Sequence, residues 1–325
     1  MYAPAAMESD TAPPPRPGRR GRKTEPFTAA RIDLLRLVVD RRLARVSPES
    51  AALPQPLGSS IAYSLLAAGK RLRPLLTVLT AMQCGTDENL PLDIACATEM
   101  VHAASLIFDD LPCMDDAAVR RGQPTNHRAF GEDTAILSAV SLLALAFRTI
   151  AEEDRVPREA RIRLVSVFSK AIGPSGLVAG QVSDLRHRAP DATLAQIRQT
   201  NIRKTAALFC ACGEAGVIIA GGSEQDRLHA CGFAENVGLA FQILDDLKDA
   251  ILSSLQIGKD VRKDFAKPTV VSALGRADAE AELAEHLDRA RLHAARIGTR
   301  PGPLLAFLDN CFPPPLLEQL AEGRA

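Results

Sequence analysis

Apolar residues at helical spacing over nearly the whole chain are the feature that most limits the possible folds. Near the start of this pattern, Ile32, Leu35 and Val39 recur at intervals of about one helical turn. Later segments are long, rich in Ala and Leu, and separated by short Gly- and Pro-containing breaks such as 173–176. No convincing run of alternating strand residues interrupts them, and Trp is absent. The pattern predicts an all-α fold, organised as one domain over residues 27–325.

Length, charge and cysteine content limit the class of protein further. The 325 residues are 46% hydrophobic, which is enough apolar material for a large core. Lys plus Arg and Asp plus Glu both total 39, so the formal net charge is zero. This balance disfavours a nucleic-acid binder held by a general positive field. The seven cysteines lack paired spacing, which indicates reduced, buried thiols in the cytoplasm, with a zinc site as the alternative.

The first 26 residues differ in character from the rest of the chain. Their prolines and the basic run at 19–23 predict a disordered, solvated tail over residues 1–26, with contact to anionic lipid or nucleic acid as the alternative. The tail has no apolar signal-peptide segment, and the longest apolar stretch, about 135–147, is too short to span a bilayer. We therefore expect no stable membrane insertion.

The first group of carboxylates follows a segment that is apolar almost all round, which is typical of a buried helix. Asp109 and Asp110 close this segment, Pro112 ends or kinks it, and Asp115 and Asp116 follow directly. Carboxylates packed so closely would repel one another unless a cation lay between them. Oxygen ligands without His or Cys indicate a hard cation, and Mg²⁺ suits a diphosphate substrate.

A second, similar group lies further along the chain. Residues 242–247 resemble 106–111, because in both an apolar helical segment ends in a pair of aspartates. Asp245 and Asp249 are one turn apart and share a helix face, with Asp246 beside them. Solvated helix ends are the alternative for either group alone. Two such groups fit two helices that face each other across a cavity.

Basic residues lie close to both acidic groups in the sequence. Arg forks and Lys ammonium groups are the side chains that bind phosphate oxygens, and a metal bridging carboxylate to phosphate would explain their presence beside acids. His102 lies seven residues before Asp109 on nearly the same helix face, so it is either a phosphate ligand or a satisfied core residue. The basic candidates are Lys70, Arg71, Arg73, Arg120, Arg121, Lys204, Lys259 and Lys267.

Taken in order, these motifs resemble those of the trans-isoprenyl diphosphate synthases, the polyprenyl synthetase family. The likeness extends from about residue 60 to 275, and the segment around 109–116 most resembles bacterial geranylgeranyl diphosphate synthases of carotenoid pathways. The matching motifs are Gly-Lys-Arg-Leu-Arg-Pro at 69–74, the aspartate-rich motif at 109–116 with Arg120 and Arg121 after it, Gly180-Gln181 with Asp184, Lys204-Thr205, the second aspartate-rich motif at 241–249, Gly258-Lys259-Asp260, and 264–267. One departure is Ala117-Ala118, where farnesyl-forming relatives tend to carry further acids.

The resemblance implies a bundle of about ten or more helices around a central cavity, and a homodimer. It implies a transferase of isoprenoid biosynthesis that joins isopentenyl diphosphate to dimethylallyl, geranyl or farnesyl diphosphate, with three Mg²⁺ ions in each active site. The implied metal ligands are Asp109, Asp110, Asp115, Asp245 and Asp249. The implied catalytic residues are Asp109, Asp115, Lys204, Thr205, Gln242 and Asp245. The implied substrate-binding residues are Lys70, Arg73, His102, Arg120, Arg121, Lys204, Thr205, Gln242, Lys259 and Lys267.

The length of the product is expected to depend on the residues one turn before Asp109. In the family, a bulky aromatic at this level stops growth at C15, whereas this chain has Ala104 and Ser105. The expected product is therefore geranylgeranyl diphosphate (C20), with farnesyl (C15) or longer products as the alternative. Two other readings compete: a class I terpene cyclase, which would not need Lys70 and Arg73, and a non-catalytic partner subunit of a prenyl synthase, which would usually lack metal ligands.

Overall fold

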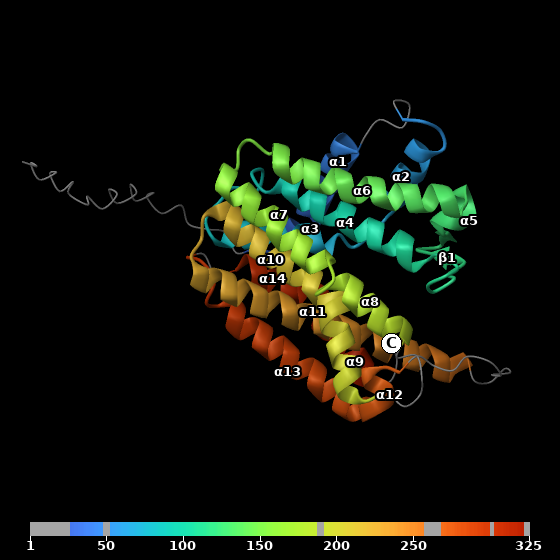
Figure 1. The fold of residues 1–325 in the computed structure, drawn as a ribbon. Helices are drawn as coiled ribbons and strands as arrows, with labels where there is room; N and C mark the ends of the chain where they lie inside the picture. The colour runs from blue at the N-terminus through green and yellow to red at the C-terminus, as the bar shows by residue number, and fades with distance from the viewer. Residues whose placement is uncertain (1–26, 48–52, 187–191, 257–267, 300–301, 322–325) are drawn as a thin grey trace, which may run out of the picture.

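The computed structural model describes residues 27–47, 53–186, 192–256, 268–299 and 302–321 (Figure 1). The predicted tail at 1–26 and the candidates Lys259 and Lys267 lie outside these ranges. The predicted all-α fold is confirmed. The helices are α1 (Ala29–Val46), α2 (Leu57–Leu65), α3 (Leu72–Gln83), α4 (Leu92–Asp109), α5 (Asn126–Phe130), α6 (Glu132–Glu152), α7 (Arg158–Ile172), α8 (Leu177–Arg186), α9 (Leu194–Asn201), α10 (Ala207–Ala220), α11 (Glu224–Gln256), α12 (Val270–Leu274), α13 (Arg276–Ala294), α14 (Pro303–Cys311) and α15 (Pro314–Ala321).

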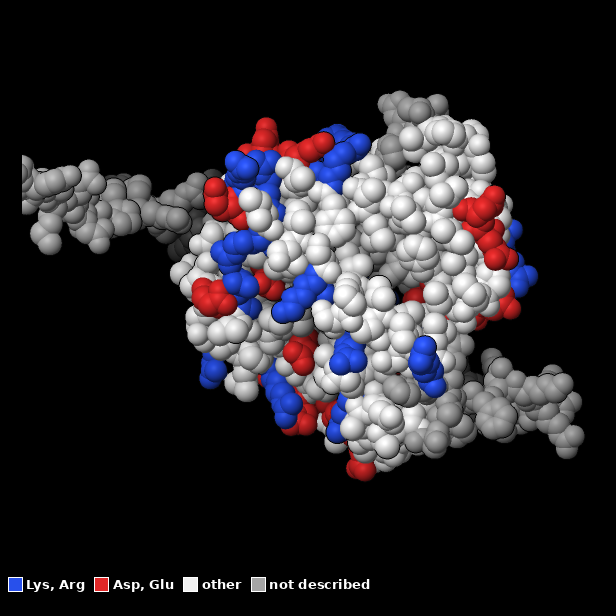
Figure 2. Space-filling view, in the orientation of Figure 1, with Lys and Arg blue, Asp and Glu red and all other residues white. Residues whose placement is uncertain are grey.

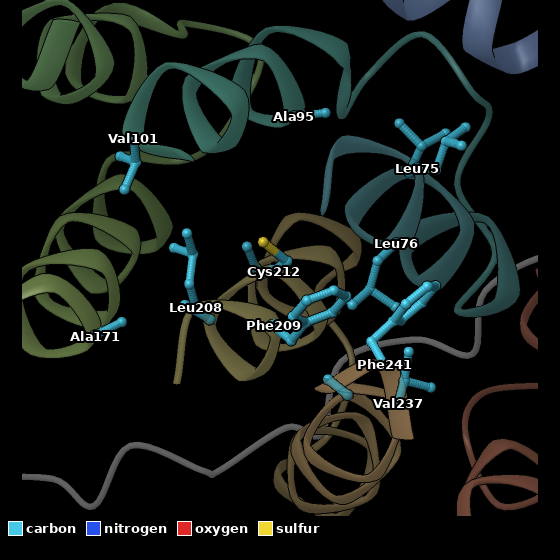
Figure 3. Close-up of a cluster of buried hydrophobic side chains, with 14 of the residues drawn as sticks. Leu75, Leu76, Ala95, Val101, Ala171, Leu208, Phe209, Cys212, Val237 and Phe241 are labelled. Atoms are coloured by element: carbon cyan, nitrogen blue, oxygen red, sulfur yellow. The ribbon is translucent and has the colours of Figure 1, made fainter. Parts of the chain in front are cut away.

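Helix α10 lies at the centre of the bundle, and its sequence explains why. It is apolar almost all round and carries only one charged residue, which suits a helix packed on several sides. Figure 3 shows Leu208, Phe209 and Cys212 of α10 among apolar side chains of α3, α4 and α11. These three α10 residues are at most 2% exposed. The cavity described below is built around this rigid centre.

Helix α4 is buried along most of its length, as its apolar sequence predicts, and it ends at Asp109. The chain then turns back within a few residues. The backbone N–H of Asp115 donates to the carbonyl of Asp109 at 2.9 Å, and Asp116 adopts a left-handed conformation with φ 46°. This turn returns Asp115 to the end of the helix, so the two aspartates lie next to each other.

A short β-hairpin follows and was not predicted. Strands β1 (Val119–Arg120) and β2 (Gln123–Pro124) pair antiparallel across a two-residue turn. Both turn residues, Arg121 and Gly122, have positive φ, at 54° and 78°. That is the requirement of the tight hairpin turns that match strand twist. The hairpin is too short to produce an alternating pattern, and it holds Arg120 and Arg121 beside the end of α4.

A single π-helical turn, η2 (Ile202–Ala206), joins α9 to α10 and carries Lys204 and Thr205. Turns of this type are often found at functional sites. Helix α8 packs very closely against it, because a Cβ atom added to Gly180 would lie 2.3 Å from the Lys204 backbone nitrogen. Only glycine fits at position 180, so this residue fixes how close α8 comes to η2.

The outer face of α6 is apolar and partly uncovered. Ile136, Leu137 and Val140 are 42%, 58% and 53% exposed. Charged side chains are sparse over α6 in the view of Figure 2. Glu132–Glu152 and Arg158–Arg186 are long and apolar enough to cross a membrane by length and composition, a test that core helices of soluble proteins also pass. The first stretch is longer than the 135–147 segment singled out from the sequence, and α6 packs on α4 within the bundle.

Candidate active site

The C-terminal part of α4 and the middle of α11 meet at one cavity of about 540 Å³. Asp109 lines it from α4 and Asp245 lines it from α11. The two acidic groups, distant in the sequence, are therefore brought to a common space, as expected for facing walls. The other predicted residues that line the cavity are Lys70, Arg73, His102, Ser105, Arg120, Arg121, Lys204, Thr205 and Gln242.

Asp109 is a partly compensated carboxylate. Burial raises its pKa to about 6; nearby Lys204 opposes this rise, and Asp115 adds to it. The Lys204 ammonium lies 3.8 Å from the Asp109 carboxylate and 2.8 Å from that of Asp184. One lysine is thus shared by two carboxylates, so the free-energy cost of burying the Asp109 charge is only partly offset. A bound cation would remove that penalty.

Asp110 is placed differently from the metal role expected of it. It is 3% exposed, and both its carboxylate oxygens accept from the Arg120 Nε–H, at 2.7 and 2.8 Å. A further contact joins Arg120 Nη2 to Asp110 at 2.6 Å. Oxygens committed to a guanidinium in this way are poorly available to a metal ion. Asp110 instead positions Arg120 at the cavity wall.

The second acidic group borders two spaces. Asp245 opens into the 540 Å³ cavity, whereas Asp246 and Asp249 line an adjoining cavity of about 420 Å³. Lys204 and Gln242 line both. Burial raises the pKa of Asp246 to about 6, and burial also raises the pKa of Asp245.

The cationic side of the cavity is formed by α3, α4 and the hairpin. Arg73 stacks over Phe209, with its guanidinium carbon 4.5 Å from the ring centroid, and its Nη1 lies 3.2 Å from His102 Nε2. The buried Nε of Arg73 has no hydrogen-bond partner among the residues that the structure describes. Burial and then Arg73 hold the pKa of His102 well below its ordinary value, so the imidazole is neutral. Burial also lowers the pKa of Arg73 and of Arg121. A bound anion would stabilise the charged forms of these closely spaced cations.

Arg71, the middle cation of the 69–74 motif, lines the cavity, but its guanidinium is bound to protein groups. It is 4% exposed and donates to Asp40, Glu99 and the Ala67 carbonyl, each at 2.7 Å. It adopts a left-handed conformation with φ 49° just before α3. Arg71 therefore anchors the loop that presents Lys70, whose ammonium lies 5.6 Å from the Phe241 ring centroid.

Thr205 and Gln242 link the two walls. The Thr205 hydroxyl donates to Gln242 Oε1 at 3.2 Å, and Gln242 Nε2 donates to Asp246 at 3.0 Å. This chain connects η2 to α11 between the acidic groups. Both residues therefore present fixed dipoles to the cavity.

The two residues expected to govern product length are placed unequally. Ser105 lines the cavity, and its hydroxyl donates to the His102 carbonyl at 2.8 Å. Ala104 is fully buried in the core and is not among the residues lining this cavity. Ser105 is thus the nearer of the two to the substrate space.

The donor set fits Mg²⁺ held together with substrate. In the part of the chain that the structure describes, no three His, Cys, Asp or Glu side chains converge closely enough to hold an ion by themselves. Mg²⁺ is usually bound through one or two carboxylates, with water and phosphate oxygens completing its shell. Asp109, Asp115 and Asp245 offer such partial shells, and the raised pKa values of Asp109 and Asp245 show that charge compensation is incomplete.

The sequence motifs did not identify some of the residues that line the cavity. Glu99 lines the cavity and binds Arg71, and the rings of Phe209 and Phe241 support Arg73 and Lys70. Each of these residues lies within an apolar helical segment, so the sequence around it is typical of a core helix. Glu99, a lone acid in such a stretch, was the one available signal.

Comparison with known proteins agrees with this geometry. The family model for polyprenyl synthetase matches residues 54–297. A geranylgeranyl diphosphate synthase of Pantoea ananas is 44% identical over 257 residues, covering 78% of this chain and 84% of that protein. A farnesyl diphosphate synthase of Geobacillus stearothermophilus is 40% identical over 259 residues, covering 78% and 87%. A crystal structure of an FPP/GFPP synthase from Zymomonas mobilis superposes with a TM-score of 0.76 at 33% identity, covering 86% and 96%.

The chain therefore belongs to the polyprenyl synthetase family, and it is a prenyl diphosphate synthase with the isoprenoid synthase fold. The similar proteins divide between geranylgeranyl and farnesyl diphosphate synthases, so the family fixes the reaction and leaves the product length open.

Proposed function

We propose that this prenyltransferase condenses isopentenyl diphosphate with dimethylallyl, geranyl or farnesyl diphosphate and releases mainly geranylgeranyl diphosphate. The observation that carries the proposal is the meeting of Asp109 and Asp245 at a cavity whose other side is the cationic group of Arg73, His102 and Arg121. Two diphosphates need two separate binding sets. The cavity offers one set of acids for metal-bound diphosphate and one of cations for metal-free diphosphate.

In this proposal, Asp109, Asp115, Asp245 and Asp249 hold Mg²⁺, three ions in all, and these ions supply Lewis-acid stabilisation of the departing diphosphate. Asp110 orients Arg120 through its paired oxygens, so Arg120 points a guanidinium at the allylic diphosphate. Lys204 shares its charge between Asp109 and Asp184 and turns toward phosphate when the acids are neutralised. Lys259 and Lys267 are proposed phosphate ligands on residue identity alone.

Isopentenyl diphosphate would bind Lys70, Arg73, His102 and Arg121. Neutral His102 can donate one N–H to a phosphate oxygen, and Arg73 Nε is an unused buried donor. The Thr205 and Gln242 dipoles face the carbon skeleton where positive charge develops. The apolar walls of α4 and α10 exclude water, which would otherwise capture the allylic cation. This two-diphosphate site distinguishes the proposal from a class I terpene cyclase.

Small side chains one turn before Asp109 support the proposed C20 product. Ser105 lines the cavity and Ala104 is buried next to it in the chain, so neither of these two positions presents an aromatic ring to a tail that extends past C15. Incubating the purified chain with farnesyl diphosphate, isopentenyl diphosphate and Mg²⁺, then chromatographing the products, tests this directly. A C20 product supports the proposal, and unchanged farnesyl diphosphate contradicts it. Activity of the chain alone would exclude a purely non-catalytic subunit.

We also propose a homodimer formed through the uncovered apolar faces of α6, α7 and α8. Beside Ile136, Leu137 and Val140 on α6, Ile162 on α7 is 59% exposed. On α8, Val178 and Val182 are 48% and 47% exposed. Burying such a surface in a dimer explains its apolar character without a membrane. We place the enzyme in the cytoplasm, supplying carotenoid or other terpenoid synthesis, and sedimentation analysis tests the dimer.

A further inference from the structure

A second cavity, of about 460 Å³, lies outside the proposed active site, between α7, α10 and α11. Cys210 of α10 and Cys231 of α11 both line it, and both are partly exposed. The cavity also contains Lys170, Glu214 and Arg227. Arg227 is ion-paired with Glu214 and Glu224, whereas Lys170 lines the same space as the thiols. Two partly exposed thiols that share a space with Lys170 are placed for chemistry that buried cysteines cannot perform.

The two cysteines are close enough to react with each other. The Cys210 thiol donates a hydrogen bond to the Cys231 backbone carbonyl at 3.5 Å, and both thiols line the same cavity. The helices approach closely at this level, because a Cβ atom added to Gly213 would lie 2.8 Å from the Ala230 carbonyl oxygen. Gly213 is one turn from Cys210, and Ala230 precedes Cys231. The close approach of the two helices at this level favours the short Cα separation that a disulfide requires.

The thiols also differ from each other in acidity. The neighbouring Cys210 thiol lowers the pKa of Cys231, and Lys170 acts in the same direction. Cys231 and burial raise the pKa of Cys210. Glu214 and Glu235 oppose ionisation of Cys231, but they are outweighed. An acidic thiol beside a thiol that retains its proton is the arrangement in which one attacks and the other resolves.

We propose that Cys210 and Cys231 form a thiol–disulfide exchange site whose substrate is a low-molecular-mass anionic disulfide such as glutathione disulfide. The Cys231 thiolate attacks one sulfur of that disulfide, forms a mixed disulfide and releases one small thiolate. Cys210 sulfur then attacks Cys231 sulfur, its proton goes to the departing small thiol, and a Cys210–Cys231 bond remains. The protein loses two electrons and two protons, and the small disulfide gains them.

The bond would join α10, which continues from the Lys204 and Thr205 turn, to α11, which carries Gln242 and Asp245. It would add a covalent link to the Thr205–Gln242 hydrogen bond between the same two segments. Because the bond would close a loop and so restrict the unfolded chain, we expect Tm to rise by roughly 3 °C on oxidation and to return on reduction.

The test treats the full-length protein with glutathione disulfide, blocks free thiols, digests with trypsin and maps disulfides by mass spectrometry. Cys210 falls in peptide 205–227 and Cys231 in peptide 228–248, so the bond appears as a cross-link of these two peptides. Fragment ions must place the link at Cys210, since buried Cys212 shares the first peptide.

Single variants make the outcome decisive. Cys210→Ala should leave a stable mixed disulfide on Cys231, whereas Cys231→Ala should leave Cys210 unmodified. Cys84→Ser serves as the matched control, because burial raises the pKa of Cys84 to about 12 and the substitution should leave the cross-link intact. Failure of the wild-type protein to form the cross-link, or equal mixed-disulfide yields on both cysteines, would overturn the proposal.

Discussion

The two acidic walls of the cavity are held in place by different means. At the end of α4, the Asp115 backbone is hydrogen-bonded to Asp109, Lys204 reaches Asp109, and Asp110 binds Arg120 with both oxygens. On α11, Asp246 accepts a hydrogen bond from Gln242, whereas the charge of Asp245 is favoured by the more distant cations Lys70 and Lys248. Protein contacts therefore hold the aspartates of the first wall in place, whereas the position of Asp245 on the second wall depends more on the ligand that binds there. Comparing variants in the two walls tests this difference.

Removal of the metal ligand on either wall should have the largest effect. We expect Asp109→Ala and Asp245→Ala to lower kcat by about 10³-fold or more, because each would delete a ligand to an ion that stabilises the leaving diphosphate. Circular dichroism should show that the helices persist. Asp278→Ala, at an exposed position on α13, is the control and should retain normal turnover. Near-normal turnover in either wall variant would remove that aspartate from the site.

Blocking the space below the first wall should change the product rather than the rate of the first addition. Ser105→Phe places a ring in the cavity, so we expect a shift from C20 to C15 product, and Ala104→Tyr adds a ring at a buried position beside it and should give a smaller shift. Chromatography of the products measures the shift. An unchanged C20 profile in both variants would refute the assigned route of the tail.

The support given to the first wall can be weakened without deleting a proposed metal ligand. Asp110→Asn removes the charge that fixes Arg120, and we expect KM for the allylic diphosphate to rise by about 10- to 100-fold. The lost contact is buried and charge-assisted, so the effect should exceed that of a surface pair. Steady-state kinetics measure it. A large loss of kcat with unchanged KM would instead indicate that Asp110 is a metal ligand.

The smallest expected effect is a pH dependence of stability. Asp109 and Asp246 have pKa values raised to about 6 from an ordinary value of 3.8, so the ion-free folded state binds more protons than the unfolded state between these limits. Ion-free stability should therefore fall as pH rises from about 4 to about 6. Mg²⁺ binds the ionised carboxylates, so the Tm increase given by Mg²⁺ with diphosphate should be larger at pH 7.5 than at pH 5.5. A pH-independent increase would contradict the raised pKa values.

Much of the fold was predictable because helical periodicity is a local property. The segment leading to Asp109 is apolar all round, and it forms the buried helix α4, which ends before Pro112 as expected. The hairpin at 119–124 was not predicted, since its strands have two residues each and its turn is defined by positive φ at Arg121. The π-turn at 202–206 left no pattern either, because it depends on α8 packing closely at Gly180.

The site was predictable in composition and less so in the use of each residue. Charged motifs identified the residues that line the cavity, because charges beside apolar helices are rare. The different roles of neighbouring residues were not visible. Arg71 and Arg73 both line the cavity, but Arg71 is bound to Glu99 whereas Arg73 contacts His102 and Phe209. Asp110 is bound to Arg120, whereas Asp109 lines the cavity. Those differences arise from tertiary contacts between residues far apart in sequence, which no local pattern encodes.

The most direct test of the central claim is a crystal structure of the enzyme with Mn²⁺ and a non-hydrolysable allylic diphosphate, with the ions located by anomalous scattering. The account predicts ions between Asp109 and Asp115 on one wall and at Asp245 on the other, all contacting the same diphosphate. Ions bound to one wall only, or a diphosphate bound without contact to either wall, would contradict it.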